Sequence, residues 1–152
     1  MSIVTIIKNI IEAIEADSNS PASYLSFYYG SKGLQNINAE DLSLPICFLD
    51  YPVTRTNKLE QSGSATESFN LDLFFFDKVD NLDSEIEADH REVIDRCDEY
   101  ARQFRIRCQQ SSDIYQVDGV STTEMINALD SNLSGVWLKI RLIKQNNQSI
   151  CI

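Results

Sequence analysis

Few side chains in this sequence are suited to proton transfer or nucleophilic attack. His90 is the only histidine, so a Ser-His-Asp or Cys-His site would have to use it. It lies at helical spacing from Ile86, Val93 and Cys97, on or beside an apolar stripe. This position favours a structural histidine over a catalytic base, and one histidine cannot build a multi-histidine zinc site.

Three carboxylates recur at every third position between a predicted strand and a predicted helix: Asp77, Asp80 and Asp83. Such groups could bind a hard cation such as calcium, but the segment lacks the glycine and the alternating ligands of an EF-hand. Turn formation and helix capping explain the same residues. No glycine-rich loop precedes a helix. We therefore expect no metal, no cofactor and no enzymatic activity.

The chain contains four cysteines: Cys47, Cys97, Cys108 and Cys151. None lies in a CxxC or CxxH pair, and no export signal is evident at the N-terminus, so free thiols in a reducing compartment are expected. Cys97 and Cys108 fall on the apolar face of a predicted helix. We interpret both as small core side chains rather than reactive groups.

The chain has 152 residues, 23 of them acidic and 13 basic, and a net charge of −10. Binding to phosphate backbones or to anionic membranes depends on clustered Lys and Arg, so this balance argues against both. No apolar run is long enough to span a bilayer. The aromatic run from Tyr24 to Tyr29 could stack on bases, but only Lys32 lies nearby. Core packing or a protein interface is therefore favoured.

Hydrophobic spacing predicts the elements of the first half. Isoleucines recur every three or four residues from Ile3 to Ile14, which predicts an amphipathic helix with a buried stripe. An edge strand is expected at 24–29. Pro45 then opens an apolar strand at 46–51.

A hairpin follows, with predicted arms at 54–61 and 67–77. Its second arm alternates strictly, which is typical of a strand with one buried face. The connection at 62–66 is small and polar, as a flexible tip would be. Phe74 and Phe76 add aromatic side chains to the otherwise polar face of the second arm.

A long helix is expected at 84–109. Ser84 and Glu87 form an S-x-x-E capping box at its start. Its apolar stripe includes His90 and the two central cysteines. Acidic residues precede basic ones at i,i+4 spacing, the more stabilising order, in the pairs Glu87–Arg91, Glu92–Arg96 and Asp98–Arg102.

The last third of the chain returns to strands. Two candidates lie at 114–120 and 122–129, and a turn is expected at 130–132 and Ser134–Gly135. Residues 136–143 alternate as a half-buried strand does. A polar tail is expected at 145–152.

Consecutive strands without regular βαβ alternation indicate an α+β fold. We predict an antiparallel or mixed sheet, an N-terminal helix and one long helix packed on one face of the sheet. Residues 1–144 are expected to form a single domain, followed by the C-terminal tail at 145–152.

This order of elements resembles that of the bacteriophage tail-terminator family and of related head–tail connector, or neck, proteins. The resemblance rests on the Pro-led strand Leu44–Leu49, the alternating arm Ser68–Phe76, the acidic linker Asp77–Asp83 before the long helix, and the closing segment Asp130–Ile140. It covers nearly the whole chain and lies in pattern rather than in an invariant motif.

The resemblance implies a structural virion protein that forms a hexameric or dodecameric ring at the head-proximal end of a phage tail. Its partners would be the portal or neck proteins and the tail-tube proteins. DNA would pass through the lumen without tight binding, for which a net charge of −10 is suitable. The protein would be located in the virion, in its tail or neck, after synthesis in the cytoplasm of the host bacterium. Another neck ring protein and a small non-viral protein-binding module remain alternatives.

The hairpin supplies the candidate oligomer interface. One face of its second arm can lie on the long helix, so the aromatic end of the other face needs cover from a neighbouring subunit or from another element of the same chain. The tip has little reason to pack on its own domain. The candidate interface residues are Phe74, Phe76, Ser62, Gly63, Ser64 and Thr66.

Overall fold

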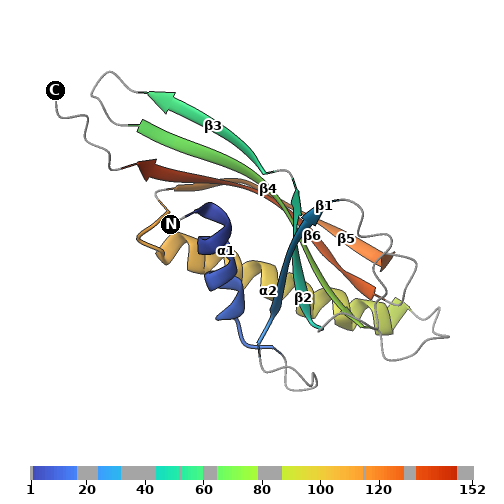
Figure 1. Ribbon diagram of the computed structural model, residues 1–152. Coiled ribbons are helices and arrows are strands. Elements are labelled where there is room, and N and C mark those ends of the chain that lie inside the picture. Colours follow the sequence, from blue (N-terminus) through green and yellow to red (C-terminus); the bar gives the residue numbers. More distant parts are fainter. Residues whose placement is uncertain are drawn as a thin grey trace.

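In the computed structural model, two helices lie against one face of a six-stranded sheet (Figure 1). The elements are α1 (Ile3–Glu12), β1 (Ser26–Ser31), β2 (Ile46–Tyr51), β3 (Thr54–Leu59), β4 (Ala65–Lys78), α2 (Glu87–Gln110), β5 (Gln116–Ala128) and β6 (Leu133–Asn146). The structure describes residues 2–16, 24–31, 44–51, 53–59, 65–78, 87–114, 116–128 and 133–146.

The sheet is mixed. Its strands are ordered β1-β2-β4-β6-β5, and β3 pairs with β4 on the side of β4 that β2 also uses. β1 and β2 run parallel, whereas the other neighbouring strands run antiparallel. The predicted α+β class is confirmed.

Helix α1 forms where the isoleucine spacing predicts it. The Ser2 hydroxyl accepts a hydrogen bond from the Thr5 amide at 3.2 Å, which caps the helix. The isoleucine stripe turns toward the core that α1 shares with α2 and the sheet. Its buried members are Ile3, Ile6, Ile7 and Ile11, and Ile14 beyond the helix end is buried with them.

Helix α2 crosses the same face of the sheet and contacts β4, β5 and β6 (Figure 1). The predicted stripe is buried from His90 onward, and its first member, Ile86, lies outside the described residues. The buried members are His90, Val93, Ile94, Cys97, Tyr100, Ala101, Phe104 and Cys108. The predicted capping residue Ser84 lies outside the described residues. The helix therefore supplies most of the cover for the centre of the sheet.

The three charge pairs predicted on α2 have different outcomes. The side chain of Glu87 lies outside the described residues, and its predicted partner Arg91 binds Glu124 of β5. The Glu92–Arg96 pair forms, with Nη1 and Oε1 3.9 Å apart. Arg102 binds Glu99 rather than the predicted Asp98: its Nε and Nη2 atoms donate to the two carboxylate oxygens of Glu99 at 2.8 and 2.7 Å. Hydrogen bonding from Arg102 lowers the pKa of Glu99 to about 2.

The central strand β4 alternates as predicted. The side chains turned toward the helices are almost fully buried, at 5% exposure or less: Phe69, Leu71, Leu73 and Phe75. The strand begins at Ala65, so Ala65 and Thr66 belong to β4 and not to the predicted connection. β2 coincides with the predicted strand at 46–51.

The two strands predicted at 114–120 and 122–129 are one strand, β5. Its register with β6 shifts twice, between Asp118 and Ser121 and between Met125 and Ala128. Gly119, at the first shift, has a φ of 62°, a conformation that glycine adopts readily. The shift interrupts the alternation of side chains, which is why the sequence indicated two strands.

Strand β6 is longer than predicted at both ends. Ser134 and Gly135, expected in a turn, pair with β4, and so do Gln145 and Asn146, expected in the tail at 145–152. A Cβ at position 135 would lie 1.7 Å from the carbonyl oxygen of Phe75. This glycine therefore permits close approach of β6 to β4 and does not mark a turn.

Candidate functional site

The outer face of the sheet, opposite the helices, has an aromatic half and a charged half. In the aromatic half, Phe48, Phe74 and Trp137 are cross-strand partners on β2, β4 and β6. The ring of Phe74 stacks on Trp137 and on Phe76, with centroids 5.7 and 6.0 Å apart. Such pairs add about 0.5–1.5 kcal/mol beyond simple burial, so this half is stabilised within the chain.

The two phenylalanines of the candidate interface have different surroundings. Phe76 is 2% exposed and packs with Ile46, Phe48 and Leu133 of its own chain. The sequence left open whether a neighbouring subunit or another element of the same chain covers the aromatic end of this face. For Phe76, the same chain provides this cover. Phe74 is half-buried and keeps some of its surface.

The remaining candidate interface residues come from the hairpin tip. Ser62, Gly63 and Ser64 lie outside the described residues. Thr66 lies in β4, paired with Lys58 of β3 and Gln145 of β6. It is thus part of the strand ladder, and its role in an interface stays a prediction.

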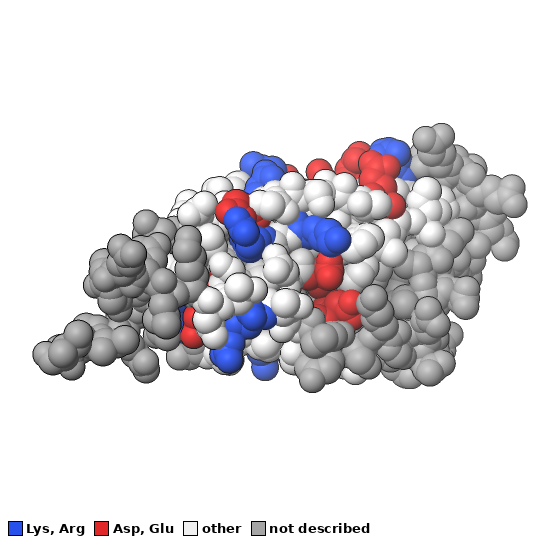
Figure 2. Space-filling model, turned by 90° about the horizontal axis from the view of Figure 1, so that it is seen from above, with Lys and Arg blue, Asp and Glu red and all other residues white. Residues whose placement is uncertain are grey.

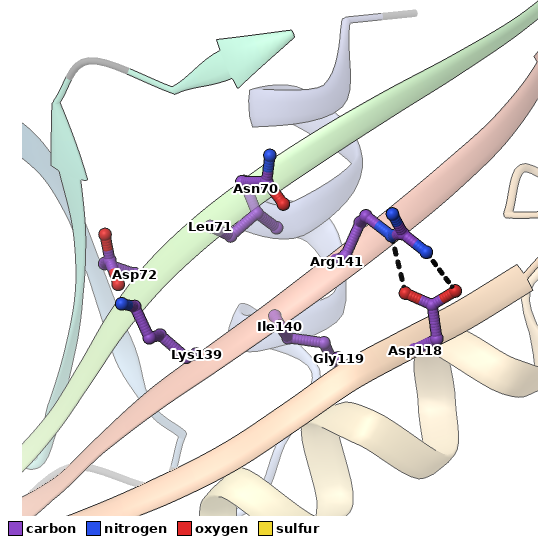
Figure 3. Close-up of a pocket in the computed structure, with 8 residues that line it drawn as sticks. All are labelled: Asn70, Leu71, Asp72, Asp118, Gly119, Lys139, Ile140 and Arg141. Carbon is purple, nitrogen blue, oxygen red and sulfur yellow. Dashed lines mark hydrogen bonds and ion pairs between the residues drawn. The ribbon is translucent and has the colours of Figure 1, made fainter. Parts of the chain in front are cut away.

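The charged half of the outer face is hollowed where β4, β6 and β5 run side by side (Figure 3). The hollow has a volume of about 620 Å³. Its lining consists of Asn70, Leu71, Asp72, Asp118, Gly119, Lys139, Ile140 and Arg141. Two acids and two bases therefore share one shallow depression.

One acid and one base of the hollow bind each other. Arg141 donates from Nε and Nη2 to the two carboxylate oxygens of Asp118, both at 2.6 Å (Figure 3). This bidentate bond lowers the pKa of Asp118 and raises that of Arg141. The pair links β6 to the edge strand β5, and its charges are directed at each other rather than at a ligand.

The other two charges of the hollow are engaged with the same tryptophan. Asp72 accepts a hydrogen bond from Nε1 of Trp137 at 2.9 Å. The Nζ atom of Lys139 lies 5.3 Å from the centroid of the Trp137 ring, within range of a cation–π contact. All four charged lining residues thus have partners in the chain, an arrangement that favours a stable sheet face over acid–base catalysis.

Seen from the outer side, acidic and basic side chains are interspersed over the described part of the surface (Figure 2). This view shows no patch of a single sign among the coloured residues. A groove that follows a phosphate backbone requires clustered basic side chains. The visible pattern therefore gives no support for nucleic-acid binding on this face.

His90 lies where the sequence placed it, in the buried stripe of α2. It is 6% exposed, and its Nδ1 atom lies 2.9 Å from the hydroxyl oxygen of Ser134 on β6. The contact links α2 to the sheet. Its position within the core fits the structural role predicted from the sequence.

Asp77, the first of the three spaced carboxylates, is buried at the end of β4. Its Oδ1 accepts a hydrogen bond from the Lys78 amide at 2.8 Å, and its Oδ2 lies 3.3 Å from Arg96 Nη2. Asp80 and Asp83 lie outside the described residues. The carboxylate of Asp77 is thus used in a contact between β4 and α2.

The described cysteines, Cys47, Cys97 and Cys108, are buried thiols. Burial raises the pKa of Cys108 to about 12, and it also raises the pKa of Cys47 and of Cys97. Such thiols are poor nucleophiles because little thiolate is present at neutral pH. Among the described residues, no three His, Cys, Asp or Glu side chains form a group that could hold a metal ion.

Large apolar side chains with substantial exposure occur at two places in the described chain. Tyr24, Tyr28 and Tyr29, in or just before β1, are 52%, 40% and 37% exposed. Val120 and Ile126, in β5, are 36% and 54% exposed. β1 and β5 are the first and last strands of the sheet order. The two groups therefore form a tyrosine edge and an aliphatic edge on opposite sides.

The sequence indicated the tyrosine edge but missed the aliphatic edge. Val120 and Ile126 both fall within the register shifts of β5, and β-bulges often redirect a side chain away from its own sheet. In the sequence, Val120 and Ile126 do not stand out from Val117 and Met125 of the same strand. The exposure of these two side chains can be inferred only once the register shifts between β5 and β6 are known.

Among the described residues, no helix is both long enough and apolar enough to cross a membrane. The sequence matches no family model, and no curated protein is significantly similar to it.

Proposed function

We propose that this chain is a structural virion protein, a tail-terminator-like ring subunit at the head-proximal end of a phage tail. The family resemblance supplies the biological setting. The observation that carries the proposal is the pair of different apolar edges, the tyrosine edge and the aliphatic edge, on opposite sides of one sheet.

Ring geometry requires two such surfaces. A head-to-tail contact joins two different patches, and rings form when that contact closes under rotation. A two-fold dimer needs only one self-complementary patch. Tyrosine is also enriched in the buried centre of protein interfaces. A subunit with unlike apolar groups on opposite edges therefore fits a ring better than it fits a dimer.

The rest of the described surface supports a structural role in preference to an enzymatic one. The charged side chains of the hollow bind one another or Trp137. His90 and the described thiols are buried in the core. Within the described part of the chain, the large exposed apolar side chains lie on the two edges of the sheet.

Within such a ring, the two ends would contact the portal or neck proteins and the tail-tube proteins. The lumen would conduct DNA without holding it, because a net charge of −10 opposes phosphate binding. A neck ring of twelve copies would use the same kind of edge contact.

Native mass spectrometry with negative-stain imaging of the purified chain tests this proposal. A closed ring is expected, and its mass distinguishes six copies from twelve. A chain that stays monomeric up to high concentration would overturn the ring and favour a monomeric protein-binding module. A discrete two-fold dimer would overturn it equally.

A further inference from the structure

We draw no further inference here: the strongest candidate, the hollow on the outer face of the sheet between β4, β6 and β5, belongs to the site already described, where its four charged side chains bind one another or Trp137 and nothing in the structure shows which ligand would fill it.

Discussion

The two faces of the central strand β4 differ in how evenly they are covered. On the face turned toward the helices, every side chain from Phe69 to Phe75 is almost fully buried. On the outer face, burial increases along the strand, from exposed Asn70 through half-buried Asp72 and Phe74 to buried Phe76. The side chains of the inner face thus serve only the core of the domain. The outer face includes side chains that stabilise the sheet and others that remain accessible to solvent.

The largest effect is expected on the inner face, at Phe104 of α2. Its side chain is fully buried, with its ring centroid 6.3 Å from that of Phe75. Phe104→Ala should lower the free energy of unfolding by about 3–5 kcal/mol, the usual range for loss of a core phenylalanine. Denaturant unfolding measures the change. Phe74→Ala on the outer face is the matched control and should lose less than half as much. Equal losses would remove the distinction between the faces.

Gly135→Ala tests the contact between β6 and β4 on the outer face. The added Cβ would lie 1.7 Å from the carbonyl oxygen of Phe75, so the two strands must separate locally. A loss of about 3 kcal/mol is expected, at the upper end of typical overpacking effects. Thermal unfolding gives the value. Ser121→Ala, a change at an exposed position of β5, should be milder. A Gly135→Ala variant as stable as wild type would show that the strands are not so closely apposed.

A smaller loss is expected at Trp137, where the aromatic and charged halves of the outer face meet. Trp137→Phe keeps an aromatic ring against Phe74 and removes the hydrogen bond to Asp72. One such bond contributes about 0.5–1.5 kcal/mol. Urea unfolding should show a loss in that range. Asp72→Asn keeps an acceptor oxygen for Trp137 and should lose less stability. A greater loss in Asp72→Asn would mean that the charge of Asp72, rather than this hydrogen bond, stabilises the sheet.

Local patterns in the sequence were sufficient for most of the inner face. The isoleucine spacing of α1, the stripe of α2 and the alternation of β4 each report a buried face directly, and each is confirmed. The positions of β2 and of the β3–β4 hairpin followed from the same reasoning. These features depend on periodicity, which a single sequence displays.

Features that depend on contacts between distant strands could not be predicted. The cover over Phe76 comes from β2 and β6, far away in the sequence. Gly135 looks like a turn residue until its approach to Phe75 is known. The aliphatic edge depends on register shifts against β6, for which Gly119 was an ambiguous sign. For this reason the sequence predicted Phe74 and Phe76 as interface residues, whereas the exposed apolar side chains of the structure lie at β1 and β5.

The smallest effect concerns the exposed pair of Asp118 and Arg141 in the hollow. Hydrogen bonds from Arg141 lower the pKa of Asp118 in the folded chain. The pair therefore stabilises the fold above the unfolded pKa of about 4, and this stabilisation is lost as the pH falls through the lower folded value. Because both groups reach solvent, salt also screens the pair.

Asp118→Asn should therefore lower the urea midpoint slightly at pH 7 in low salt. Its difference from wild type should shrink on addition of salt and again as the pH is taken below about 4, where the Asp118 carboxylate of the unfolded chain is protonated first, and vanish below the lower folded pKa. Asp95→Asn, which removes an exposed acid from α2, controls for the change in net charge. A difference that persists unchanged at low pH would mean that Asp118 stabilises β5 by a contact other than its charge. The charged half of the outer face would then resemble the inner face more closely than the ion pair suggests.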